Sequence, residues 1–126
     1  MYKLAIVDDE YWVRKGLSET IEWETFGVEV VGTAADGEEA LKLIEREAPD
    51  ILITDMRMPG MDGIETAREI RKVVGADVTI IIMTAYDWAS IEQEAKLAGV
   101  NLLMNKPMFR SSLISAFNQA LGIKEA

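Results

Sequence analysis

Five short apolar runs, separated by segments with helical spacing, constrain the fold of this chain more than any other feature. The runs are rich in Ile, Val and Leu and lie at residues 4–7, 28–34, 51–54, 78–83 and 102–104. The run at residues 51–54, for example, is of the β-branched kind expected for a parallel strand that is buried on both faces, because neither face then needs polar side chains. Strict alternation of strands and helices predicts an α/β fold, in which right-handed crossovers place helices on both faces of a parallel sheet.

The segments between the runs carry the signals of helix starts and stops. Apolar residues recur at helical spacing after the first run, and Asp36 is positioned as the N-cap of a second helix that Pro49 ends. A third helix begins near Gly63, a fourth spans residues 88–98, and a last one begins near Ser111. The predicted fold is therefore a flavodoxin-like, doubly wound (βα)5 sandwich with strand order 2-1-3-4-5.

Polar residues follow four of the five runs, at the points where the strands are expected to end. Asp8 and Asp9 follow the first run, Asp55 follows the third, Thr84 follows the fourth and Lys106 follows the fifth. In the order 2-1-3-4-5 the first and third strands flank the switch point, where α/β sheets bind their ligands. We therefore expect three carboxylates, a hydroxyl and a lysine to meet at one edge of the sheet.

Such a cluster has a definite chemistry. Three carboxylates held together repel one another unless a cation offsets their charge. Magnesium prefers oxygen ligands and usually takes one or two carboxylates, which fits Asp9, Asp55 and a backbone carbonyl in the loop that follows. Lys106 adds a positive charge and Thr84 a hydroxyl donor. Together they would accept a phosphoryl group on a carboxylate nucleophile.

Composition excludes several other classes of function. The chain has no cysteine and no histidine, so disulfides, cysteine nucleophiles, histidine bases and metal sites built on thiolate or imidazole are excluded. A net charge of −9 argues against direct nucleic-acid binding and favours a protein partner or a cation. No apolar run approaches the roughly 20 residues of a membrane span, and acidic residues interrupt the N-terminus before it could serve as a signal peptide. We therefore expect one cytoplasmic domain over residues 1–126 that has no membrane contact.

At these strand ends the chain resembles the receiver domains of two-component response regulators. The resemblance covers nearly the whole chain, and its motifs are Val7-Asp8-Asp9-Glu10, Thr54-Asp55-Met56 with Met58-Pro59-Gly60-Met61-Asp62-Gly63, Thr84-Ala85 and Lys106-Pro107. Each motif alone is weak, but four of them at strand ends in the right order form a specific signal. The N-terminal two thirds of the chain is more similar to receivers joined to AraC-type DNA-binding domains, and residues 98–111 are more similar to receivers of hybrid sensor kinases.

The resemblance implies a role for each matching residue. Asp55 corresponds to the phosphoacceptor, which takes a phosphoryl group from the phosphohistidine of a partner kinase. Asp8 and Asp9 correspond to the acidic pair that holds Mg²⁺ together with Asp55, and the main-chain carbonyl of Arg57 corresponds to a further ligand. Thr84 is similar to the hydroxyl that moves onto the phosphoryl group during switching.

The remaining correspondences concern the lysine, the rate of phosphate loss and the output. Lys106 is similar to the lysine that pairs with the phosphoryl group. Arg57 and Tyr86 match positions that tune how fast phosphate is lost to water. Most receivers carry Tyr or Phe three residues before the lysine, and here that position is Leu103. A rotating aromatic ring therefore cannot couple Thr84 to an output surface in this chain.

The resemblance also implies partners and leaves alternatives open. The partners would be a histidine kinase or phosphotransfer domain and a downstream effector domain or protein, with homodimerisation on phosphorylation as a further option. Such a domain is a signalling module that assists its own phosphorylation and dephosphorylation, not a turnover enzyme. One alternative is a phosphorelay receiver cut from a hybrid histidine kinase. Another is an aspartyl-phosphate phosphatase of the haloacid dehalogenase type, but that class has a second aspartate where this chain has Arg57.

Two further alternatives use the same fold. A flavodoxin-like cofactor binder would need a Gly/Ser/Thr-rich phosphate loop after the first strand, where this chain has Asp8-Asp9-Glu10. A pseudo-receiver that only binds proteins would normally lack part of the acceptor set, which is complete here.

Overall fold

A computed structural model of the chain describes residues 1–85, 88–106, 118–119 and 122. Its core is a five-stranded parallel sheet of order β2-β1-β3-β4-β5. The strands are β1 Tyr2–Val7, β2 Val28–Ala34, β3 Ile51–Asp55, β4 Thr79–Thr84 and β5 Leu102–Asn105. The helices are α1 Tyr11–Glu19, α2 Gly37–Glu47, α3 Gly63–Val74 and α4 Trp88–Ala98, with a 3-10 turn, η1, at Trp23–Phe26. The predicted flavodoxin-like fold and strand order are confirmed.

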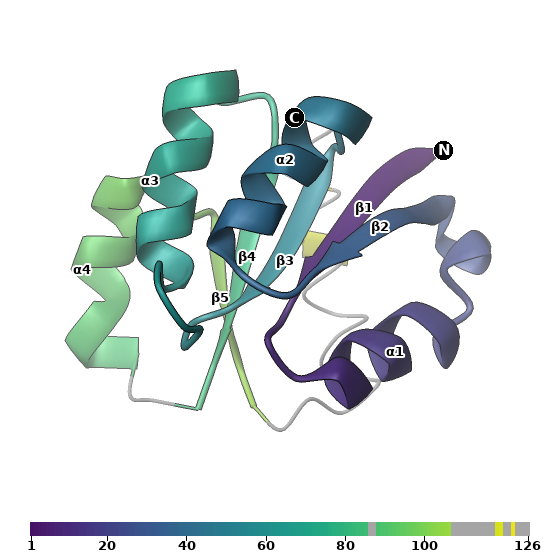
Figure 1. The fold of residues 1–126 in the computed structure, drawn as a ribbon, viewed down its shortest axis with the longest axis horizontal. Coiled ribbons are helices and arrows are strands. Elements are labelled where there is room, and N and C mark those ends of the chain that lie inside the picture. Colours follow the sequence, from purple (N-terminus) through teal and green to yellow (C-terminus); the bar gives the residue numbers. More distant parts are fainter. Residues whose placement is uncertain (86–87, 107–117, 120–121, 123–126) are drawn as a thin grey trace.

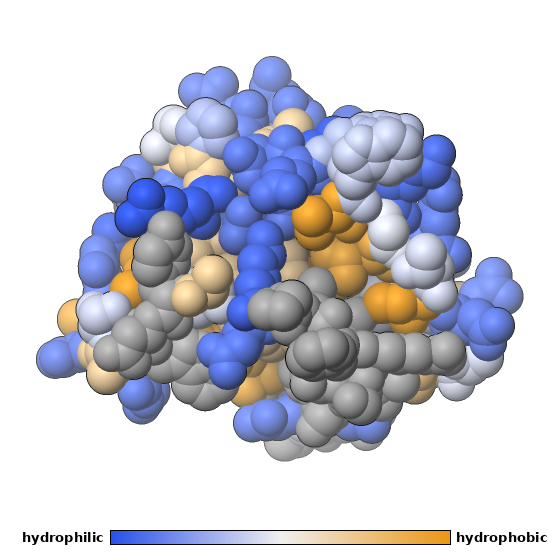
Figure 2. Space-filling model, turned by 90° about the horizontal axis from the view of Figure 1, so that it is seen from below, coloured by the Kyte–Doolittle hydropathy of each residue, from blue (hydrophilic) through white to orange (hydrophobic). Residues whose placement is uncertain are grey.

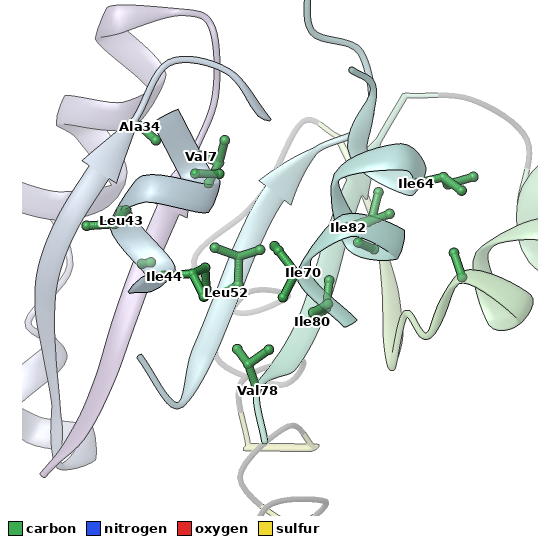
Figure 3. Packing of buried hydrophobic residues seen from close by; sticks show 14 of the residues in the cluster. Val7, Ala34, Leu43, Ile44, Leu52, Ile64, Ile70, Val78, Ile80 and Ile82 are labelled. Carbon is green, nitrogen blue, oxygen red and sulfur yellow. The ribbon is translucent and has the colours of Figure 1, made fainter. Parts of the chain in front are cut away.

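The sheet separates two apolar layers, because successive strand residues point to opposite faces. In β1, Ala5 and Val7 join the layer beneath α2, α3 and α4, whereas Leu4 and Ile6 join the layer that contains Leu17 of α1. Figure 1 shows α2 and α3 in front of the sheet, and Figure 3 shows their side chains meeting those of the strands. Both faces of β1, β3 and β4 are thus buried over most of their length, which is why these three strands are nearly continuous apolar runs in the sequence.

Two helices begin at an aspartate that caps them. The Asp36 carboxylate accepts a hydrogen bond of 2.9 Å from the Glu39 N–H at the start of α2. Asp62 accepts one of 2.8 Å from the Glu65 N–H at the start of α3. Each cap satisfies a backbone donor that the helix itself leaves unpaired. The cap at Asp36 was predicted from the sequence, whereas the cap at Asp62 was not.

A glycine fixes how closely α3 approaches the end of β3. A Cβ atom at Gly63 would lie 2.6 Å from the Asp55 carbonyl oxygen and 3.1 Å from the Met56 Cα. The Gly63 N–H also donates to the Met56 carbonyl at 2.8 Å. Contacts this short leave no room for a side chain, so a glycine is required where α3 starts beside the candidate site.

The edge strand β2 contains an irregularity. Leu4 pairs with Val30 and Ala5 pairs with Gly32, so Val31 is an extra residue in β2 and forms a bulge. The other pairings of β1 run without interruption from Tyr2 to Leu4 and from Ala5 to Val7.

Other details differ from the sequence prediction or lie beyond it. The first strand begins at Tyr2, earlier than predicted, and η1 was not predicted, although Trp23 is buried there as a packing residue. The expected helix from about Ser111 and the expected Lys106-Pro107 junction involve residues outside the described ranges. Within those ranges, no helix has the length and apolar character needed to cross a membrane.

Candidate functional site

The site lies at the carboxyl ends of β1 and β3, as the strand order predicts. Carboxylate oxygens of Asp8, Asp9 and Asp55 all lie within 4.8 Å of one another. Figure 2 views the molecule from the side on which these strands end and shows hydrophilic surface through the middle of this face, with an apolar patch beside it. Asp8 is fully buried, Asp55 is 7% exposed and Asp9 is exposed. The cluster thus has two buried carboxylates and one that faces solvent.

Lys106 offsets the charge of the two buried carboxylates. Its Nζ lies 3.1 Å from Asp8 Oδ2 and 3.2 Å from Asp55 Oδ1, and its side chain is only 20% exposed. Charged groups this close in a partly buried site interact much more strongly than they would in water. One amino group therefore joins the ends of three strands, because Asp8 follows β1, Asp55 ends β3 and Lys106 follows β5.

This environment shifts the acidity of two groups. Burial, followed by the negative charge of Asp8, raises the pKa of the Asp55 carboxyl above its ordinary value, and Lys106 only partly offsets this. For Lys106, burial alone would lower the pKa of the amino group. Its hydrogen bond to Asp8 and the charges of both aspartates outweigh burial and raise that pKa. Lys106 therefore stays charged at neutral pH and holds the pair together.

Backbone hydrogen bonds hold the strand ends in place. The Lys106 N–H donates to the Thr84 carbonyl at 2.9 Å, and the Met56 N–H donates to the Met83 carbonyl at 2.9 Å. Thr84 itself is buried, with 1% of its surface exposed. Thr84 thus belongs to the same edge as Asp55 and Lys106, as predicted.

Two predicted residues lie close to this edge without joining the carboxylate cluster. Arg57 is exposed in the loop that follows β3. Leu103 is partly buried in β5, where it pairs with Ile82 of β4 and lines a hollow of about 200 Å³ between α4 and β5. A third predicted residue, Tyr86, lies outside the described part of the chain.

The sequence pattern did not reveal every residue that shapes the site. Arg14 reaches back from α1, and its Nη1 donates a hydrogen bond of 2.7 Å to the Asp8 main-chain carbonyl. Gly63 allows α3 to start against the Asp55 backbone. An arginine six positions after the first aspartate would have been the only signal for Arg14, and such a spacing is common in solvated helices.

The three carboxylates form a group that could hold a metal ion, and the Lys106 amino group beside them carries the positive charge that an anion would need. Oxygen ligands of this kind suit Mg²⁺. A carboxylate at the end of β3 is a nucleophile for acyl or phosphoryl chemistry, and Lys106 beside it can stabilise a transferred anionic group.

Comparisons with known proteins assign the chain to a family. A sequence model of the response regulator receiver domain matches residues 4–118. The uncharacterised transcriptional regulatory protein YesN of Bacillus subtilis is 34% identical over 121 residues, which cover 96% of this chain and 33% of YesN. This chain thus spans about a third of that relative.

Relatives closer to this chain in length have the same domain. Sporulation initiation phosphotransferase F of Bacillus subtilis is 36% identical over 125 residues, which cover 97% of this chain and 95% of that protein. The REC domain of AraT, a response regulator from Geobacillus stearothermophilus, superposes with a TM-score of 0.87 at 36% identity, covering 98% of this chain and 95% of the other. The chain belongs to the response regulator receiver domain family of two-component signalling.

Proposed function

We propose that this domain accepts a phosphoryl group on Asp55 from the phosphohistidine of a partner histidine kinase or phosphotransfer domain, in a Mg²⁺-dependent reaction. The observation that carries the proposal is the meeting of Asp8, Asp9 and Asp55 within 4.8 Å, beside the Lys106 amino group. Membership of the receiver family supports it. Residues 1–126 would then form one receiver domain of a signalling protein.

Asp55 is the nucleophile in this proposal. One of its carboxylate oxygens attacks phosphorus, a P–O bond forms as the P–N bond of the phosphohistidine breaks, and the electron pair stays on the imidazole nitrogen. The side chain is poised for this, because it ends β3 and remains 7% exposed. Lys106, 3.2 Å from Asp55 Oδ1, stabilises the negative charge that the phosphoryl group brings.

The residues present fit a magnesium ion. Asp9 is exposed and can offer its carboxylate directly, whereas the Asp8 carboxylate already accepts from Lys106 and from the Glu10 N–H at 2.9 Å. Asp9 and Asp55 would therefore be direct ligands and Asp8 would act through water, and the likeness to receiver domains implies the Arg57 carbonyl as a further ligand. When bound, the ion neutralises charge on the cluster and on the phosphoryl oxygens.

Switching follows from the groups around Asp55. Thr84 would move its hydroxyl onto the phosphoryl group, while Arg57 and Tyr86 would set how fast phosphate is lost. Because Leu103 replaces the usual aromatic residue, we propose that the change reaches an effector, or a second copy of the domain, through repacking at the hollow of about 200 Å³ between α4 and β5. The partner then recognises side chains of α4 and β5.

The proposal is tested by intact-mass spectrometry after incubation with acetyl phosphate, with and without Mg²⁺. We expect one added phosphoryl group on the wild type only when Mg²⁺ is present, and none on Asp55→Asn. The control is Asp77→Asn, an exposed aspartate that precedes β4 at the other end of the sheet. A modified Asp55→Asn protein, or a wild type that is never modified, would overturn the assignment.

The ligand assignment has its own test. Asp9→Asn should weaken Mg²⁺ binding in isothermal titration calorimetry, and the matched control is Glu10→Gln, which removes one negative charge from the neighbouring exposed residue. Equal affinity in Asp9→Asn and wild type would exclude Asp9 as a ligand. Steady turnover of a phosphate monoester by the isolated domain would instead favour the phosphatase alternative.

A further inference from the structure

We propose that Arg14 is a positioning residue for the cation site: it fixes the peptide unit between Asp8 and Asp9 and so aims the Asp9 carboxylate at the cluster. The inference rests on the proposed Mg²⁺ site and adds a residue of α1 to it. The hydrogen bond that the Arg14 side chain makes at this site goes to a main-chain carbonyl, not to the carboxylate of Asp8, Asp9 or Asp55. It acts on the main chain from which the ligand Asp9 projects.

The turn after β1 is held at each polar atom of Asp8. The Asp8 N–H donates to the Ala34 carbonyl at 3.0 Å, which ties the turn to β2. Asp8 Oδ1 accepts from the Glu10 N–H at 2.9 Å, and Oδ2 accepts from Lys106 at 3.1 Å. Its carbonyl accepts from Arg14 at 2.7 Å, the shortest of the four. That carbonyl belongs to the peptide unit that joins Asp8 to Asp9, so its direction sets where the Asp9 side chain leaves the backbone.

Asp9 depends on this indirect support. Its carboxylate is exposed, and within the described part of the chain it makes no hydrogen bond or ion pair of its own. It nevertheless has an oxygen within 4.8 Å of those of Asp8 and Asp55. A solvated side chain with no direct restraint keeps such a place only through its backbone. On the N-terminal side of Asp9, this backbone is the Asp8–Asp9 peptide unit, whose carbonyl accepts the hydrogen bond from Arg14.

Arg14 is itself held in place. The main-chain N–H of Arg14 donates to the Glu10 carbonyl at 3.1 Å in the first turn of α1, so the helix fixes the backbone from which this side chain extends. The centre of its guanidinium group lies 5.7 Å from the centroid of the Tyr11 ring, a cation–π contact that limits the motion of the side chain. Arginine can contact the Tyr11 ring and the Asp8 carbonyl at the same time, because the edge of its planar guanidinium group carries the N–H donors while the face of the group stacks on a ring.

The sign of the effect separates positioning from simple charge. A positive charge near a carboxylate cluster repels a cation, so losing the charge of Arg14 should by itself tighten Mg²⁺ binding. Losing the hydrogen bond that orients the turn should instead weaken Mg²⁺ binding. Groups that orient metal ligands from outside the coordination shell typically change metal affinity by about 10-fold to 100-fold when removed. We therefore expect the positioning effect to exceed the charge effect.

The chain offers a matched control at the next position. Lys15 carries the same charge on the same helix turn, and its Nζ also lies over the Tyr11 ring, at 5.8 Å from its centroid. It is exposed and makes no hydrogen bond to the acidic turn among the described residues. Lys15→Met and Arg14→Met thus remove equal charge from neighbouring sites, and only the second removes the contact with the Asp8 carbonyl.

The test is isothermal titration of Mg²⁺ into the purified domain at two salt concentrations, with thermal unfolding followed by circular dichroism to establish that each variant is folded. We expect Arg14→Met to raise the Kd for Mg²⁺ by about tenfold. Lys15→Met should leave it unchanged or lower it slightly. The loss of Mg²⁺ affinity in Arg14→Met relative to the wild type should persist at high salt, because salt screens interactions between charges but does not restore the missing hydrogen bond.

Arg14→Lys keeps the charge and a donor and serves if Arg14→Met does not fold. It should weaken Mg²⁺ binding less than the loss of the donor does, but still measurably, because an amino group lacks the planar head that stacks and donates together. Wild-type affinity in both Arg14 variants, or tighter binding in Arg14→Met, would overturn the inference. Failure of the wild type to bind Mg²⁺ would instead refute the proposed function, so the two failures are distinguishable.

Discussion

Replacing Gly63 by alanine should destabilise the domain, because the new methyl group would enter space that the backbone of β3 already occupies. The ideal Cβ would sit 2.6 Å from the Asp55 carbonyl oxygen, whereas side-chain Cβ atoms essentially never approach within 3.0 Å. The start of α3 or the end of β3 must therefore move by at least 0.4 Å, the difference between these two distances. The nearest atoms are all backbone, so no side chain can rotate away to relieve the contact.

The size of the effect can be worked out from two opposing contributions. Overpacking against rigid neighbours costs about 2–3 kcal/mol. Alanine also reduces the conformational freedom of the unfolded chain, which offsets about 0.5–1 kcal/mol. The net loss is about 1–2.5 kcal/mol, which for a domain of this size corresponds to a fall in Tm of about 4–10 °C.

The assay is urea unfolding followed by circular dichroism, with Gly16→Ala as the matched control. Gly16 lies inside α1, and among the described residues no atom lies within 4 Å of a Cβ placed there. The same substitution should therefore stabilise the domain by about 0.5–1 kcal/mol at Gly16, through helix propensity alone. A Gly63→Ala protein at least as stable as the wild type would refute the packing argument.

Three further predictions concern charge and hydrogen bonding. In the folded domain the pKa of Asp55 is raised above its ordinary 3.8, so ionising this group opposes folding, and its cost develops as pH rises from below 3.8 through the raised pKa. Asp55→Asn should therefore be more stable than wild type at pH 7 without divalent cations, and urea unfolding at a series of pH values should show the difference vanish in acid. Lys106→Met, which leaves two buried carboxylates without their cation, should lower the free energy of unfolding by about 2–3 kcal/mol, and a double-mutant cycle should show a smaller loss in the Asp55→Asn background. Arg71 donates to the carbonyls of Gly75, Val78 and Gly99, so Arg71→Met should cost about 2–4 kcal/mol in thermal unfolding. Its control, Arg68→Met, removes only an exposed ion pair with an N–O distance of 3.3 Å and should cost less than about 1 kcal/mol.

The strand order and the meeting of Asp8, Asp9 and Asp55 could be predicted because both depend on regular patterns along the chain. Apolar runs mark buried parallel strands, and a doubly wound sheet brings the ends of its first and third strands together wherever those strands lie in the sequence. Helix α4 and strand β2 have the predicted bounds. The three carboxylates could therefore be assigned to one edge of the sheet without any knowledge of side-chain conformations.

The contacts that refine this edge could not be predicted in the same way. The reach of Arg14 to the Asp8 carbonyl depends on the angle at which α1 leaves β1, and no periodicity encodes that angle. The need for a glycine at position 63 depends on the distance between the start of α3 and the end of β3, and no regular pairing pattern sets that distance. The apolar face of α2 shows a similar limit. The helical spacing of Ala40, Leu41, Ile44 and Ala48 predicts that all four belong to this face. The helix ends at Glu47, however, so Ala48 is an exposed residue in the left-handed conformation, and Leu43 is buried beside Ala40 and Ile44.

The bulge at Val31 has a consequence for how copies of this domain can associate. β2 is an edge strand, and a straight edge offers a row of free backbone donors and acceptors to which a strand of another molecule can add. The extra residue in β2 breaks the spacing of that row, so a second chain cannot pair along its full length. Strand addition at this edge is therefore disfavoured, and any association between copies of the domain would have to use another part of its surface.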